Sequence, residues 1–279
     1  MTVLSKRTQF GFLIGFFVAF NSTADDTNLV KQVTFQQVLE LPANASTKRY
    51  TYGSHHSQYI DYWPAPTQID SAAHVIFIHG GCWLKEYDMS HTNPASSALS
   101  EAGFNVWSIE YRRLGEEGGD WPASLNDVKA AIKQIQKKLN GEPAAVMGHS
   151  AGGHLALLAA SGAGSAAQNI KTVVGLAAIT DIVSYTQAEG SCNRAAANLM
   201  NTAYEEESDY KKASPDAYDL HTNTWLIQGS ADNIVPVSQT QGLNVHIKMI
   251  EGAGHFDLIH PHSIAWQPII QLLNKELNP

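Results

Sequence analysis

The chain has 279 residues, of which 44% are apolar and 16% are charged. This balance fits one globular domain or two small ones, and it is too apolar for an intrinsically disordered protein. The formal net charge of −8 argues against a nucleic-acid-binding protein, which needs a basic face to neutralise phosphates.

The first residues follow the pattern of a secretory signal peptide. Lys6 and Arg7 precede an apolar run over residues 10–20, and small residues follow as far as Ala24. The run is shorter than the roughly 20 residues that cross a bilayer, so a membrane anchor is the weaker alternative. We therefore expect residues 1–24 to be a signal peptide. The remaining protein would be periplasmic or secreted, with no stable membrane insertion.

The chain has two cysteines, Cys82 and Cys192, which are too few for a disulfide-built scaffold. Export would place them where a disulfide survives, but their positions in the sequence do not show whether they meet. A disulfide and two separate thiols both stay open. No Cys/His grouping has the spacing of a zinc site, so we expect no metal site.

Strand-like and helix-like apolar runs alternate along the chain. Residues 29–62 resemble edge strands, and residues 182–215 form the longest irregular insertion, which we expect near the pocket. Alternating short apolar strands and amphipathic helices predict an α/β fold, with a mostly parallel sheet covered by helices on both faces. The clearest strands are 75–79, 105–111, 144–148, 173–178, 224–228 and 245–250, and the clearest helices are 94–102, 122–139, 152–160 and 268–277.

The loop after the first of these strands reads His-Gly-Gly-Cys-Trp over residues 79–83. Consecutive glycines let the backbone turn its N–H groups toward a developing oxyanion. We expect the N–H groups of Gly81 and Cys82 to form an oxyanion hole together with that of Ala151. Trp83 is expected to bind substrate as a wall of the acyl pocket, with plain packing in the core as the alternative. His79 is expected to brace the turn.

The strand 144–148 leads directly into Gly-His-Ser-Ala-Gly at residues 148–152 and then into an apolar helix. This is the G-x-S-x-G pattern in a strand–turn–helix setting, which lifts a serine hydroxyl above the sheet. Ser150 is therefore the expected nucleophile. His149, inside the turn, is expected to be structural.

A serine hydroxyl needs a base to take its proton and an acid to orient that base. Asp232 follows the strand 224–228, and His255 follows the strand 245–250. With Ser150 they keep the order Ser…Asp…His of α/β-hydrolases. Two other acids compete for the role of Asp232. Asp181 also follows a strand, but that strand comes one earlier in the chain than expected. Asp257 is too near His255 in sequence to reach beneath its ring readily.

The segment 79–83 resembles the HGGxW oxyanion motif of kynurenine formamidases and related carboxylesterases, within the α/β-hydrolase superfamily. The likeness extends over residues 70–270. It implies a single α/β-hydrolase domain over residues 25–279, no cofactor, and hydrolysis of small esters or of an arylformamide. The matching segments are 79–83, 111–114, 121–128, 148–154, 192–200, 213–215, 229–236 and 254–259.

The sequence thus predicts a serine hydrolase that cleaves small carboxylic esters through an acyl-enzyme intermediate. An arylformamidase is the alternative enzyme, and export favours the esterase because the formamidase substrate arises inside cells. A non-catalytic exported binding protein on the same fold is the rival from another class. The expected partner is a small-molecule ester, and the oligomeric state stays open.

Overall fold

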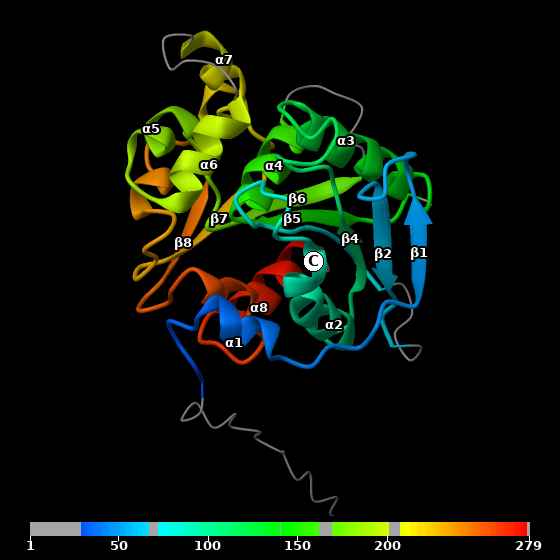
Figure 1. Ribbon diagram of the computed structural model, residues 1–279. Coiled ribbons are helices and arrows are strands. Elements are labelled where there is room, and N and C mark those ends of the chain that lie inside the picture. Colours follow the sequence, from blue (N-terminus) through cyan, green and yellow to red (C-terminus); the bar gives the residue numbers. More distant parts are fainter. Residues whose placement is uncertain (1–28, 67–71, 140, 162–168, 201–206, 278–279) are drawn as a thin grey trace, which may run out of the picture.

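A twisted sheet of eight strands runs through the centre of the molecule in the computed structural model (Figure 1). The structure describes residues 29–66, 72–139, 141–161, 169–200 and 207–277. The expected signal peptide, residues 1–24, lies outside these ranges. None of the helices in the described ranges combines the length and apolar character that a bilayer crossing needs.

The strand order is β1-β2-β4-β3-β5-β6-β7-β8. β1 and β2 pair antiparallel at one edge, and the six strands from β4 to β8 are parallel. The order reverses between β3 and β5, where loops at the carboxyl ends diverge and leave room for a ligand. The strands are β1 (Lys48–Thr51), β2 (Tyr59–Trp63), β3 (His74–Ile78), β4 (Asn105–Ile109), β5 (Ala144–His149), β6 (Ile170–Leu176), β7 (Thr224–Gly229) and β8 (His246–Ile250).

Helices cover both faces of the sheet, as Figure 1 shows: α3 (Ala123–Gln136) and α4 (Ala151–Ala160) lie on one face, and α2 (Asn93–Glu101) and α8 (Trp266–Leu277) on the other. All residues of β3 are buried, as expected for a central strand covered on both sides. α4 is buried all round, because it packs between the sheet and α3. The expected α/β architecture is confirmed, with element ends shifted by a few residues.

Two segments differ from the sequence-based expectation. The segment expected to begin the edge strands instead starts with the helix α1 (Phe35–Leu39), because Thr34 and Gln37 form a reciprocal capping box. The insertion over 182–215 is largely helical rather than irregular. Its described parts contain α5 (Ile182–Gln187), α6 (Ser191–Met200) and α7 (Glu207–Lys212).

Candidate active site

The turn between β5 and α4 has the geometry of a nucleophile elbow. Ser150 is the single residue between them. Its φ of 56° and ψ of −120° form a backbone conformation that residues other than glycine rarely adopt. An added Cβ at Gly152 would collide with the carbonyl oxygens of Ile78 and His79, and one at Gly148 would collide with the Gly152 carbonyl. This turn therefore requires glycine at both position 148 and position 152.

Backbone hydrogen bonds hold Ser150 in this conformation. Its N–H donates to the Leu176 carbonyl of the neighbouring strand over 2.8 Å, and its carbonyl accepts the N–H of His154 over 3.0 Å. A residue in such a region costs about 1–3 kcal/mol, which the surrounding structure must offset. The side chain lies at the amino end of α4, where N–H groups and the helix dipole favour negative charge.

His255 lies after β8, and its imidazole contacts Asp232, which follows β7. Its Nδ1–H donates to Asp232 Oδ2 over 2.8 Å, and both side chains are almost fully buried. Asp232 Oδ1 accepts the N–H groups of Ile234 and Val235 at 2.8 and 2.9 Å. Burial alone would raise the pKa of Asp232, but the His255 contact and these N–H groups outweigh it and lower that pKa below its ordinary value. An ionised Asp232 therefore holds Nδ1 protonated and leaves Nε2 free to act as a base.

The two competing acids serve other purposes. Asp181 caps α5 by accepting a backbone N–H of its first turn. Asp257 is fully buried and accepts three backbone N–H groups, from residues 32, 33 and 254. Neither forms a hydrogen bond with His255 in the described part of the structure. Of the three acids, Asp232 is the one the fold brings to the imidazole.

The loop 79–83 turns its backbone toward the elbow. Gly81 and Cys82 both have positive φ, 104° and 52°. Within the described ranges, the N–H groups of Gly81, Cys82 and Ala151 have no hydrogen-bond acceptor in the protein. The loop also lies close to the nucleophile, since an added Cβ at Gly80 would come within 3.1 Å of the Ser150 Cβ. The three N–H groups are therefore available to an oxyanion.

A buried histidine–glutamate pair fixes the peptide between Gly80 and Gly81. His79 Nδ1 lies 2.8 Å from the Gly80 carbonyl, and its Nε2 lies 3.0 Å from Glu110 Oε1. Burial would raise the pKa of Glu110, but the facing His79 outweighs it and the pKa is lowered. Because a trans peptide is planar, holding the Gly80 carbonyl directs the N–H of Gly81 the opposite way.

These groups meet in a pocket of about 200 Å³. The sequence-predicted residues Gly81, Cys82, Ser150 and His255 line it. So do residues that sequence reasoning missed: Phe35, Leu84, Tyr87, His91, Ser191, Ile234 and Phe256.

Aromatic side chains form one side of the pocket. The ring of Phe35 packs against Tyr87 and Phe256, each with ring centroids 5.5 Å apart. Phe256 adjoins the catalytic-histidine candidate and was within reach of sequence reasoning. Phe35 was not, because it comes from a segment far away in the chain with no motif of its own.

Trp83 packs in the core, which is the alternative role expected for it, and it does not line the pocket. Its indole is fully buried and packs edge-on against His154 of α4, with ring centroids 5.2 Å apart. The physical reason is the backbone reversal over residues 81–83, where φ is positive three times in succession. This reversal sends the side chain at position 83 into the core and leaves Leu84 at the pocket.

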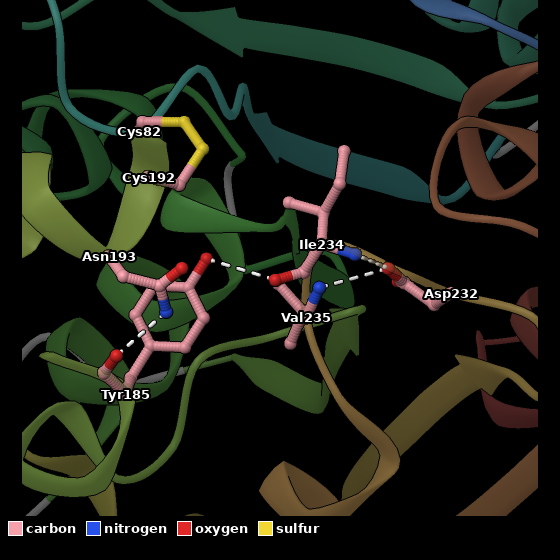
Figure 2. The surroundings of a disulfide bond; sticks show 7 residues. All are labelled: Cys82, Tyr185, Cys192, Asn193, Asp232, Ile234 and Val235. Atoms are coloured by element: carbon pink, nitrogen blue, oxygen red, sulfur yellow. Dashed lines mark hydrogen bonds between the residues drawn. A yellow bond between two sulfur atoms is a disulfide. The ribbon is translucent and has the colours of Figure 1, made fainter. Parts of the chain in front are cut away.

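The structure answers the question that the sequence left open about the two cysteines. Cys82 and Cys192 form a disulfide, with their Cα atoms 5.0 Å apart (Figure 2). Both line the pocket, so the helical insertion borders the pocket through the first residues of α6. No group of three or more His, Cys, Asp or Glu side chains is placed to hold a metal ion within the described ranges.

Three histidines around the site are buried in neutral form. Burial lowers the pKa of His91 to about 3 and that of His154 to about 4, and it holds the pKa of His149 well below its ordinary value. Each ring donates to a backbone carbonyl: His91 to Asp88 over 2.6 Å, His149 to His255 over 3.1 Å and His154 to Ala213 over 2.6 Å. The bond from His149 ties the elbow to the loop that carries the base.

The free energy of unfolding is therefore expected to decrease as the pH falls below about 6.5. Below that pH the histidines of the unfolded chain bind protons, while the buried rings of the folded protein stay neutral. Their contribution to the unfolding free energy is therefore full above about pH 6.5 and is lost progressively as the pH falls. For His154 the loss near pH 4 amounts to about 3 kcal/mol. Urea unfolding near pH 7 and near pH 4.5 should show a smaller loss for His154→Gln, which does not titrate. Equal losses in the variant and the wild type would contradict this interpretation.

Sequence comparison relates the chain to known hydrolases. It is 28% identical over 210 residues to esterase LipQ of Mycobacterium tuberculosis, covering 68% of this chain and 49% of that protein. It is 33% identical over 118 residues to the probable carboxylic ester hydrolase LipM of the same organism, covering 39% and 27%. It is 26% identical over 214 residues to kynurenine formamidase of Meyerozyma guilliermondii, covering 71% and 79%. The chain thus spans about a quarter to a half of the length of the two mycobacterial relatives.

Solved structures share the fold. Esterase B from Lactobacillus rhamnosis superposes with a TM-score of 0.69 at 19% identity, covering 86% of this chain and 88% of that one. A truncated carbohydrate esterase from gut microbiota superposes with a TM-score of 0.67 at 23% identity, covering 85% and 99%. The α/β-hydrolase fold implied by the motifs is therefore confirmed.

A family profile also matches the chain. The profile of BD-FAE matches residues 61–247, about two thirds of the chain. The matched region includes the elbow serine and the acid loop, and it ends before His255. The chain belongs to the BD-FAE family, a carboxylesterase group of the α/β-hydrolases.

Proposed function

We propose that this protein is a serine hydrolase of small carboxylic esters, with Ser150 as nucleophile, His255 as base and Asp232 as orienting acid. One observation carries the proposal. An Asp232–His255 pair, a serine on a constrained elbow and unpaired backbone N–H groups converge on one pocket. Acyl transfer needs these components and no cofactor.

The geometry supports a two-step reaction. His255 Nε2 takes the Ser150 proton as the hydroxyl oxygen attacks the ester carbonyl, and Asp232 stabilises the resulting imidazolium. The N–H groups of Gly81, Cys82 and Ala151 stabilise the oxyanion. The alcohol leaves with the proton from His255, and water then hydrolyses the acyl-enzyme with the same base.

The substrate is expected to be small. A pocket of about 200 Å³ is below the roughly 300–1,000 Å³ of sites that enclose drug-sized ligands. Its lining is mainly aromatic and aliphatic around the serine. kcat/KM for p-nitrophenyl esters should therefore be highest for short acyl chains and decrease as the chain lengthens.

An arylformamidase is the second candidate, favoured by the similarity to a kynurenine formamidase over 71% of the chain. The deciding measurement compares kcat/KM for p-nitrophenyl acetate with that for N-formylkynurenine. We expect the ester to be at least about tenfold better, and the reverse order would favour the formamidase. A folded protein that turns over neither and resists a fluorophosphonate probe would be a binding protein.

We further propose that residues 1–24 are a signal peptide and that the protein is exported to the periplasm or secreted. The charge and apolar pattern of these residues supports this, and a disulfide elsewhere in the chain fits an oxidising compartment. N-terminal sequencing of the protein recovered from an export-competent host should begin at Asp25. A mature protein that begins at Met1 would contradict cleavage.

A further inference from the structure

The disulfide joins two parts of the pocket that are 110 residues apart in the sequence. Cys82 lies in the oxyanion loop, and Cys192 is the second residue of α6. Figure 2 shows the bond between the two segments. Among the described residues, neither the N–H nor the carbonyl of Cys82 has a hydrogen-bond partner in the protein. The covalent bond therefore holds Cys82 directly, whereas its neighbours are held by hydrogen bonds: the Gly81 carbonyl accepts the Leu84 N–H, and the Trp83 carbonyl accepts the Leu114 N–H.

A chain of hydrogen bonds continues from the disulfide to the acid loop. Asn193, next to Cys192, donates from Nδ2 to the Tyr185 carbonyl over 2.7 Å. The Tyr185 hydroxyl donates to the Ile234 carbonyl over 3.2 Å, and the Ile234 N–H donates to Asp232 Oδ1. Figure 2 shows this row of contacts: Asn193 and Tyr185 lie below the disulfide, the Tyr185 hydroxyl points to the Ile234 carbonyl, and Asp232 lies beyond it.

The first link of this row, from Asn193 to Tyr185, is shielded from solvent. The Tyr185 ring and the Asn193 side chain are both buried. A buried hydrogen bond holds its partners more firmly than an exposed one, because no water competes for the donor or the acceptor. The row thus connects the oxyanion loop to the acid loop through α5 and α6.

The backbone conformation of Cys82 is expected to change if the disulfide is broken. Its φ of 52° is in the left-handed region, which is unfavourable for a residue with a side chain. Without its attachment, the Cys82 peptide can relax toward the ordinary region. That rotation would turn its N–H away from the site of the oxyanion.

We infer that Cys82–Cys192, continued by Asn193 and Tyr185, is a brace that positions the oxyanion donor at Cys82 and the loop of Asp232 relative to each other. These four are positioning residues, because they act through backbone groups. The inference rests on the proposed hydrolase function. Breaking the brace should lower kcat more than it raises KM, since oxyanion stabilisation is needed in the transition state.

The first test is reversible reduction of the wild-type protein. The chain has only these two cysteines, so a phosphine reductant acts on this bond alone, and thiol titration reports its completeness. We expect kcat for p-nitrophenyl acetate to fall about 10- to 100-fold with KM within about threefold, and reoxidation to restore it. Cys82→Ser/Cys192→Ser should show the same split without reductant.

The second test leaves the disulfide intact, in case its loss unfolds the protein. Tyr185→Phe removes the hydroxyl that binds the Ile234 carbonyl and should lower kcat about three- to tenfold at unchanged KM. Tyr218→Phe is the matched control. Its exposed hydroxyl also donates to a backbone carbonyl, that of Lys212, but it lies outside the brace. Its kcat should equal that of the wild type.

The outcomes separate the brace from the function on which it rests. An oxidised wild type that hydrolyses neither esters nor formamides would contradict the proposed function and, with it, the brace. An active wild type whose kcat survives complete reduction would contradict the brace alone. So would a loss confined to KM, or equal kcat values for Tyr185→Phe and Tyr218→Phe.

Discussion

Ser150→Ala is expected to lower kcat/KM for p-nitrophenyl acetate by about 10⁴- to 10⁶-fold. The methyl group cannot attack the carbonyl, and the imidazole is left with no hydroxyl to deprotonate. The oxyanion N–H groups remain, so the variant should still hydrolyse the ester faster than water alone does. Stopped assays with purified protein, and loss of fluorophosphonate labelling at this residue, measure the effect. A variant that keeps more than about 1% of the activity would contradict the nucleophile assignment.

Ser150→Gly is a control for the fold of the inactive protein. It removes the same hydroxyl, so it should be equally inactive. Its unfolding free energy should nevertheless exceed that of Ser150→Ala by about 1 kcal/mol, because glycine adopts φ 56° without steric cost. Equal stabilities would show that the elbow conformation is not strained for a side chain.

The parallel core of the fold could be predicted because periodicity and burial agree there. β3 is apolar at nearly every position, and α3 has an apolar stripe facing the sheet. The edges could not, because local interactions decide them. A two-residue capping box at Thr34 and Gln37 makes a helix of a segment that reads as a strand. The insertion forms α5 and α6 because Asp181 caps α5 and the two short helices pack against each other.

The site residues also differ in whether the sequence alone could place them. Ser150, Asp232 and His255 could be placed because each follows a strand, and the carboxyl ends of parallel strands meet at one edge of a sheet. The sequence alone could not place Trp83, because its direction depends on three successive positive φ values. It also could not place Phe35, which reaches the pocket only through the tertiary fold.

Asp232→Asn is expected to lower kcat/KM by about 10³- to 10⁴-fold without unfolding the protein. The orientation of the new amide is set by its surroundings. Oδ1 accepts two backbone N–H groups, from Ile234 and Val235, whereas Oδ2 accepts one side-chain N–H, from Gln228, besides His255, so we expect the amide oxygen to stay at the Oδ1 position. The NH₂ group then faces His255 Nδ1, which must become an acceptor. The ring carries its proton on Nε2 in that state and cannot take the proton of the serine.

Asp181→Asn is the matched control for this substitution. Asp181 is the competing acid, and its carboxylate caps α5, a role that asparagine fills equally well. Its kcat/KM should stay within about threefold of the wild type and its melting temperature should be unchanged. If Asp181→Asn proved the inactive variant and Asp232→Asn the active one, the orienting acid would be Asp181. Comparable losses of kcat/KM in the two variants would also contradict this prediction, because Asp181 forms its hydrogen bond with α5 and Asp232 with His255.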